Sequence, residues 1–390
     1  MPRNNPRTLI GAFVASFALV VAACGSDTTS PLPSAVSVTA APASVAPTPV
    51  ESGIPNPTPA ASPSQAVIGA GSWTATGSMI RGRSHGAAAT VLQDGKVLVA
   101  GGEAEDTFAT AATELYDPAT GSWTRTGKLH SRRRGDSATL LADGQVLVIG
   151  GFGSPPRVGE LYDPGTGTWS LTRQMARWRY SPSVAALADG RVLVFGGWAE
   201  SGTWSHRADL YDPTTGRWDA TGHMAAPQGP FTVLGDGRVL VMHEGNAPEV
   251  FDPITGRWRS VARPTTDVPW NALVLLADGR ALALSTRDGE SELYDPTADR
   301  WIATSTSHTG EGPATLLDDG TVLVVGKVRS SRFDPTTGSW SDVPRPPLPR
   351  DYALDSIDGV EVNMIARLPD GKVLATEGGS AAVYDPTSAR

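Results

Sequence analysis

The sequence has one cysteine, few charged side chains and a single long apolar run. The lone cysteine, Cys24, excludes disulfide bonds within the chain and any multi-cysteine metal site. Charged residues make up 18% of the 390 residues, below the roughly 25% that is usual. The net charge of −8 argues against a generic nucleic-acid-binding protein. Gly and Pro are abundant by contrast, at 43 and 32 residues, and many turns with few charges indicate an all-β protein.

The apolar run lies near the N-terminus, from Leu9 to Ala23, behind two arginines. It is too short for a comfortable membrane span, which needs about 20 residues, and has the pattern of a secretory signal. Its end, Val21-Ala22-Ala23-Cys24-Gly25, resembles the lipobox of bacterial lipoproteins. The resemblance implies that residues 1–23 are a signal peptide and that Cys24 is lipidated. It also implies a lipid-anchored protein outside the cytoplasm, in a bacterial cell envelope.

A tether follows the cysteine. Residues 25–70 contain nine Pro and only two charged residues, and show no hydrophobic period. This composition favours an extended linker. We therefore expect residues 24–70 to carry the lipid and act as a tether, and residues 71–390 to form the folded domain.

The remainder of the chain repeats one unit seven times, and each unit is marked by three signals. The first is an Asp-Gly pair, followed by an apolar run, at Asp94, Asp143, Asp189, Asp236, Asp278, Asp319 and Asp370. The second is an aromatic-Asp-Pro triplet beginning at Tyr116, Tyr162, Tyr211, Phe251, Tyr294, Phe333 and Tyr384. The third, in the first six units, is Trp123, Trp169, Trp218, Trp258, Trp301 and Trp340. A period of 40–50 residues with such marks indicates a stacked or radial array.

Each unit is predicted to contain four short strands. The Asp-Gly pair is a strong hairpin signal between the first and second strands. A Gly pair, as at Gly101-Gly102, often ends the second strand. The Asp-Pro turn joins the third strand to a fourth that opens at the Trp.

This pattern resembles the kelch repeat, whose hallmarks are the Gly pair, the spaced Tyr and the Trp. The resemblance covers residues 72–390 and implies an all-β, seven-bladed β-propeller of four-stranded blades. The last unit lacks its Trp, and an unmatched Trp73 precedes the first unit. We therefore expect residues 72–77 to supply the outer strand of the last blade and close the ring.

Function is expected where the repeats differ. Alternation of the strands places the loops after the second and fourth strands on one face, here called the loop face. Four Trp residues outside the repeat fall there, together with polar groups at the predicted mouth of the channel. The candidate ligand-binding residues are Arg83, His85, Arg132, Arg134, Trp178, Arg179, Tyr180, Trp198, Trp204, Trp270 and Asn271.

Flat aromatics beside Arg and carboxylates suit either a glycan or a protein ligand. The sequence therefore predicts a binding module that contacts the membrane only through its lipid, with no nucleic acid partner and no cofactor. A sugar-modifying enzyme is the alternative, because some kelch propellers are sugar-acid epimerases. Its acid and base groups would be Glu311 and Glu361 at the channel mouth.

The sequence offers little support for an enzyme that uses a metal ion or a radical. The copper-radical sugar oxidases contain a related propeller, but their chemistry needs a Cys crosslinked to Tyr, and the only Cys here is in the lipobox. No His-x-His or His-Glu-x-x-His spacing is present, and no metal ligands are assigned. The acidic loop from Asp351 to Glu361 lacks an EF-hand pattern, so Ca²⁺ binding there stays open.

Overall fold

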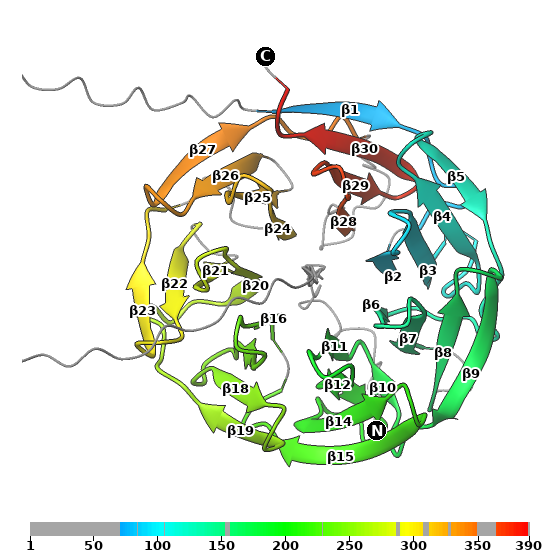
Figure 1. The fold of residues 1–390 in the computed structure, drawn as a ribbon, viewed down its shortest axis with the longest axis horizontal. Coiled ribbons are helices and arrows are strands. Elements are labelled where there is room, and N and C mark those ends of the chain that lie inside the picture. Colours follow the sequence, from blue (N-terminus) through cyan, green and yellow to red (C-terminus); the bar gives the residue numbers. More distant parts are fainter. Residues whose placement is uncertain are drawn as a thin grey trace, which may run out of the picture. The chain divides into compact units, whose positions relative to one another are not determined.

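The computed structural model describes residues 71–83, 85–104, 106–152, 157–227, 229–285, 289–306, 312–326, 329–348 and 364–388. These residues form strands, turns and loops, with no helix among them. Seven sheets of four antiparallel strands follow one another around a ring (Figure 1). The prediction of a seven-bladed β-propeller is confirmed. Among the described residues, there is no helix with the length and apolar character needed to span a membrane.

The first strand of each blade lies nearest the centre of the ring, and the fourth lies at its rim (Figure 1). Blades 1 to 3 are formed by β2 (His85–Val91), β3 (Val97–Glu103), β4 (Thr113–Asp117) and β5 (Ser122–Arg125); β6 (Asp136–Leu140), β7 (Val146–Gly150), β8 (Val158–Asp163) and β9 (Thr168–Gln174); and β11 (Ser183–Ala186), β12 (Val192–Phe195), β14 (Arg207–Asp212) and β15 (Arg217–His223). A separate two-stranded sheet pairs β10 (Arg179–Tyr180) with β13 (Trp198–Ala199).

Blades 4 to 7 repeat the same order. They are formed by β16 (Phe231–Val233), β17 (Val239–Val241), β18 (Glu249–Asp252) and β19 (Arg257–Ser260); β20 (Trp270–Leu275), β21 (Ala281–Ser285), β22 (Ser291–Asp295) and β23 (Arg300–Ala303); β24 (Ala314–Leu316), β25 (Val322–Val325), β26 (Ser330–Asp334) and β27 (Ser339–Val343); and β28 (Met364–Arg367), β29 (Val373–Glu377), β30 (Ser380–Asp385) and β1 (Ser72–Thr76).

The ring closes as the unmatched N-terminal Trp predicts. Strand β1 pairs antiparallel with β30, with Trp73 opposite Tyr384. Their ring centroids are 5.1 Å apart, the same distance as for Tyr116 and Trp123 in blade 1. Trp73 therefore takes the place of the Trp that the seventh repeat lacks, and the edge of β30 is covered.

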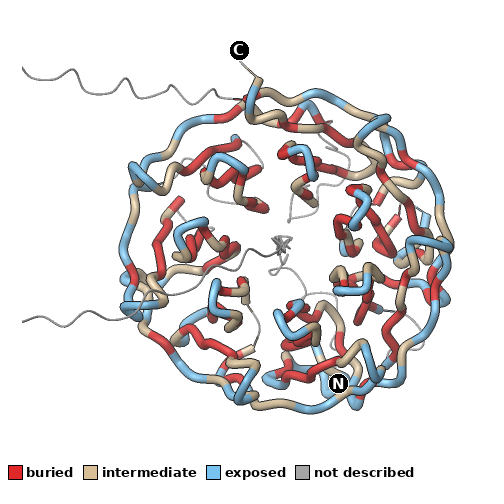
Figure 2. Tube along the Cα trace, in the orientation of Figure 1, coloured by how far each residue is buried: buried red, intermediate tan, exposed pale blue. Residues whose placement is uncertain are grey.

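The hydrophobic core lies between neighbouring blades. The second strands are buried on both faces because each blade packs on two others, which explains their unbroken apolar runs (Figure 2). Leu98 and Ala100 of blade 1, for example, share one cluster with Val146 and Val148 of blade 2. Each such fully buried Val or Leu side chain stabilises the fold by about 1.5–3 kcal/mol.

The Trp of the repeat joins one blade to the blade before it. Trp123 Nε1 of blade 1 donates a 2.8 Å hydrogen bond to the carbonyl of Gly77, at the end of β1 in blade 7. The same bond recurs from Trp169 to Gly127, Trp218 to Arg173, Trp301 to Ala262 and Trp340 to Ser305. This recurrence supports a structural role for the repeat Trp residues.

Candidate functional site

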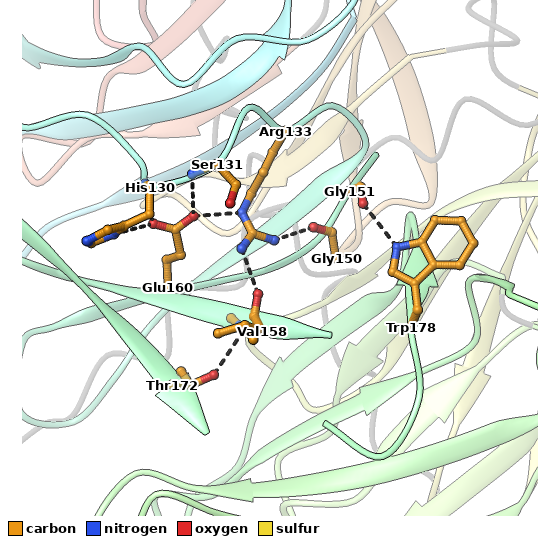
Figure 3. A network of polar contacts seen from close by, with 10 residues as sticks. His130, Ser131, Arg133, Gly150, Gly151, Val158, Glu160, Thr172 and Trp178 are labelled. Atoms are coloured by element: carbon orange, nitrogen blue, oxygen red, sulfur yellow. Dashed lines mark hydrogen bonds and ion pairs between the residues drawn. The ribbon is translucent and has the colours of Figure 1, made fainter. Parts of the chain in front are cut away.

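A buried arginine in the segment before β6 of blade 2 shows how the loop face is built (Figure 3). Arg133 Nε donates to Glu160 at 3.0 Å, and its two Nη atoms donate to the carbonyls of Gly150 and Val158 at 2.6 Å. Glu160 also accepts the backbone N–H of His130 at 2.7 Å. The arginine and glutamate side chains are 2% and 0% exposed. Paired and hydrogen-bonded in this way, two buried charges can be tolerated.

The same arrangement occurs in blades 1 and 3. Arg83 pairs with Glu114 at 2.9 Å and donates to the carbonyl of Gly101. Arg179 pairs with Asp209 and donates to the carbonyl of Gly196. The predicted role of Arg83 and Arg179 at the channel mouth therefore needs correction. Both guanidinium groups lie inside their blades, where they hold the Gly-pair turn against the third strand.

The carboxylates of these pairs form a repeat that sequence reasoning missed. In blades 1, 2, 4 and 5, an acidic residue two positions before the repeat aromatic accepts one or two backbone N–H groups of the segment leading to the first strand of the same blade. Glu292, for example, accepts the N–H groups of Thr265 and Thr266 at 2.9 Å. The signal was present in five units, at Glu114, Glu160, Asp209, Glu249 and Glu292.

Trp270 is also placed away from the surface of the loop face. Trp270 is 8% exposed, belongs to the core cluster of blades 4 and 5, and stacks with Trp301 at a centroid distance of 6.3 Å. Asn271 is half-buried in β20. The predicted binding role of Trp270 is not supported, because its indole already packs inside the ring.

Six aromatic side chains come together on the loop face of blades 1 to 3 and are here called the aromatic cluster. They are Phe108, Phe152, Trp178, Tyr180, Trp198 and Trp204. Phe152 is central, because its ring centroid lies 5.8 Å from that of Phe108, 6.1 Å from that of Trp178 and 6.0 Å from that of Tyr180. These contacts join three separate loops.

The pairing of β10 with β13 extends the cluster. Tyr180 lies opposite Trp198 in this small sheet, so their side chains emerge on the same face. Trp198 in turn contacts Trp204 edge to face, at 5.4 Å. The cluster is open to solvent, since Phe108 is 56%, Phe152 53% and Trp198 38% exposed.

Charged side chains border the aromatic cluster. The guanidinium carbon of Arg134 lies 4.4 Å from the centroid of the Phe108 ring, and its Nε pairs with Glu103 at 3.1 Å. Arg157 and Glu200 form a second pair at 2.7 Å, on the loops that carry Phe152 and Trp198. The cation–π contact between Arg134 and Phe108 and the two ion pairs therefore lie at the edge of the aromatic cluster.

The structure thus brings together five of the predicted residues: Arg134, Trp178, Tyr180, Trp198 and Trp204. Arg132 is exposed, and its contact with Thr107 is long, at 3.5 Å. The two central Phe residues were missed, because only Trp residues outside the repeat were counted. Phe152 directly follows a Gly pair, as Trp198 does in blade 3, and this position was the available signal.

Several predicted groups lie outside the described residues. These are Cys24 and the rest of residues 1–70, Glu311, Glu361 and the acidic loop. His85 belongs to β2, but its side chain is not among those described. The acid and base groups of the alternative enzyme therefore stay predictions. The described part of the chain contains no group of three or more His, Cys, Asp or Glu side chains that could hold a metal ion.

A hollow of about 350 Å³ lies on the opposite face, between the Asp-Gly turns of blades 4 and 5. Its carboxylates are engaged by the turns themselves. Asp236 pairs with Arg238 at 2.7 Å and Asp278 pairs with Arg280 at 2.6 Å. The hollow is therefore a groove between two repeated turns and not a second candidate site.

Comparison with known families and structures decides the relationship. The kelch motif matches residues 133–176 and 179–224, which are blades 2 and 3, and the same unit recurs around the whole ring. The motif matches and the seven-bladed ring support the kelch-repeat propeller family. Kelch propellers commonly mediate protein interactions, and the fold suggests a binding or interaction module.

This kelch propeller also resembles solved structures in its fold. One is a fungal alcohol oxidase of the AA5 family in complex with copper, with a TM-score of 0.64 and 16% identity, covering 81% of this chain and 76% of that one. Another is a streptogramin B lyase, with a TM-score of 0.61 and 11% identity, covering 80% and 97%. No curated protein sequence matches significantly. At such identities the likeness concerns the fold alone.

Proposed function

We propose that this kelch protein is an extracytoplasmic binding module, anchored by lipid at Cys24, that docks a glycan or a protein ligand on the aromatic cluster. One observation carries the proposal. Six aromatic side chains from loops of three blades form one partly exposed group, although nothing in the repeat requires them.

Physical chemistry favours binding at such a surface. Exposed contiguous apolar patches on soluble domains usually mark interaction sites. Trp, Tyr and Arg are the side chains that most often dominate binding energies. The aromatic cluster offers all three types, with Arg134 and its partner Glu103 at the edge.

A protein ligand is the occupant that the central residues favour. Phe108 and Phe152 carry no polar atom and are each more than half exposed. Such rings gain most from burial against apolar side chains of a partner. The indoles of Trp178 and Trp198 would also suit the apolar face of a sugar, so a glycan is the other outcome that the test must detect.

The test compares two variants of the full chain in detergent micelles. The triple variant Phe108→Ala/Phe152→Ala/Trp198→Ala removes the exposed rings of the cluster. The control, Ile254→Ala, removes the side chain of a residue that is 94% exposed in an Asp-Pro turn on the opposite face. If the ligand is a glycan, we expect its signal on a glycan array to fall by at least about 100-fold in the triple variant and to stay unchanged in the control. Glycan signals above background that are equal in the two variants would refute the site, and no signal from the wild-type chain would exclude the glycan and leave the protein ligand.

The anchor has a separate test. Cys24→Ser removes the only thiol that could be lipidated. We expect the wild-type chain to sediment with membranes and to carry acyl chains on Cys24 by mass spectrometry, and the variant to do neither. An unmodified Cys24 in the wild-type protein would overturn this part of the proposal.

A further inference from the structure

Asp136 is a buried carboxylate for which the fold described above gives no use. It begins β6, the innermost strand of blade 2, and is 2% exposed. Neither carboxylate oxygen has a hydrogen-bond partner among the described residues. Both oxygens face Gly101 of blade 1, where a β-carbon would lie only 2.8 Å from each of them. An unpaired buried carboxylate is costly in its ionised form.

The charged groups around Asp136 are occupied elsewhere. Arg83 and Arg133 attract the carboxylate, and Glu160 repels it. Each arginine, however, donates to two backbone carbonyls and to its own carboxylate, Glu114 or Glu160. Burial therefore outweighs the attraction and raises the pKa of Asp136 to about 7.

Further titratable groups stand one layer away. His130 contacts the far side of Glu160 at 3.0 Å. On the solvent side, Arg134 pairs with Glu103. Neither of these pairs includes an oxygen of Asp136.

The backbone beside Asp136 is where the loops of the aromatic cluster meet. The carbonyls of Arg133, Arg134 and Gly135 accept, in turn, the N–H groups of Gly102, Phe152 and Ser181, each at 2.8 Å. Gly102 leads into the loop with Phe108, and Ser181 follows Tyr180. Three consecutive carbonyls thus hold the loops of blades 1, 2 and 3 together.

Gly135 completes this junction from the other side. Its N–H donates to the carbonyl of Gly86 in blade 1 at 2.8 Å, and the ring of Tyr180 packs on its α-carbon. Ser181 holds an uncommon positive φ of 48° beside it. The loop arrangement is therefore strained and depends on the position of residues 133–136.

We propose that Asp136 is a proton-binding site that regulates ligand binding at the aromatic cluster. The neutral carboxyl keeps residues 133–136 packed against Gly101, with the three loops held as described. Ionisation places an unpartnered charge in the seam between blades 1 and 2, which is relieved by opening the seam to water. Ligand binding is then tighter in acidic than in alkaline solution. This inference rests on the proposed function of the cluster.

Amide hydrogen exchange measured by mass spectrometry tests the proposal without a ligand. The full chain in detergent micelles is compared at about pH 5.5 and pH 8.5, after correction for intrinsic exchange rates. We expect peptides covering 101–110, 150–152 and 178–183 to lose protection by about tenfold or more at the higher pH, whereas peptides of blades 4 and 5 do not. In Asp136→Asn this pH dependence should vanish.

Two further variants serve as controls for the exchange experiment. Asp219→Asn, at an exposed position of β15, should behave as the wild type does. If Asp136→Asn fails to fold, Asp136→Ala replaces it, because blade 1 has Ala87 at this position, opposite the first glycine of its Gly pair. An unchanged pH profile in a folded Asp136 variant would overturn the proposal.

The experiments can refute the proton site and the proposed function independently of each other. Exchange that follows Asp136 with no effect of the cluster variants on binding would leave the proton site standing and remove the binding face. If binding depends on the cluster but hydrogen exchange does not change with pH, the binding face is supported and the proton site is refuted.

Discussion

The guanidinium of Arg133 and the carboxylate of Glu160 meet at 3.0 Å inside blade 2, with their side chains 2% and 0% exposed. This pair links the segment before the innermost strand to the third strand. Arg134, the next residue, lies with its guanidinium over the ring of Phe108. The ion pair therefore connects the interior of a blade to the surface that we propose binds a ligand.

Breaking this pair should destabilise the propeller. Arg133→Met leaves Glu160 buried without its cation, so we expect the free energy of unfolding to fall by about 3–5 kcal/mol. Denaturant unfolding followed by Trp fluorescence measures the effect. Arg132→Met, at the exposed neighbouring position, should change it by less than about 0.5 kcal/mol. Similar values for the two variants would contradict a structural role for the buried pair.

Asp136 should give the stability a distinct pH dependence. Its pKa is about 7 in the folded protein against an ordinary value of 3.8, so the native state binds the proton more tightly than the unfolded chain. Stability from this group is complete below about pH 4, declines as the pH rises and is lost above about pH 7. The full decline is at most about 4 kcal/mol.

Asp136→Asn should remove that decline. We expect the melting temperature of the variant to exceed that of the wild type most strongly above pH 7, with the difference shrinking toward pH 4. Thermal scans across this range make the comparison. A difference that is constant with pH, or one that grows toward pH 4, would show that Asp136 does not titrate in this window.

The closing strand makes a third prediction. Deleting Ser72–Thr76 removes the partner of β30 and the packing of Trp73 on Tyr384. Trp73 is half-buried, so the loss of its packing costs less than the roughly 3–5 kcal/mol of a fully buried Trp, and the bare edge of β30 invites association between chains. We expect a lower melting temperature and oligomers in size-exclusion chromatography. Deleting residues 40–44 in the tether is the control, and equal behaviour of the two deletions would argue against closure by β1.

The sequence was sufficient for the fold because the decisive signals are local. An Asp-Gly hairpin and an Asp-Pro turn specify four strands per unit, and seven copies specify the ring. Trp73 predicted the closing strand, since a repeat lacking its Trp and an isolated Trp elsewhere complete each other. No long-range information was needed for these steps.

The candidate site was predicted only in part, because it depends on which way side chains point. Arg83 and Arg179 stand where the channel mouth was expected, but they turn into their blades. In blade 2 the inward residue is Arg133, while Arg132 is exposed and Arg134 borders the cluster. A shift of one residue thus separates a structural arginine from a surface one, and the repeat pattern does not reveal it.

The aromatic cluster required knowledge of how loops from different blades meet. Phe108 and Phe152 are 44 positions apart, and hydrogen bonds to residues 133–135 hold their loops side by side. Sequence alone marked the Trp residues as unusual. It did not mark the Phe residues that join them.

Site-specific photo-crosslinking in intact cells that normally produce the protein tests the central claim most directly. A benzophenone amino acid placed at Phe152 samples the aromatic cluster, and the same group at Ile254 samples an exposed position on the opposite face. We predict a discrete covalent adduct with a protein or a glycan at position 152 that is absent at position 254. No adduct at position 152, or the same adducts at both positions, would contradict the assignment of the loop face of blades 1 to 3 as the binding surface.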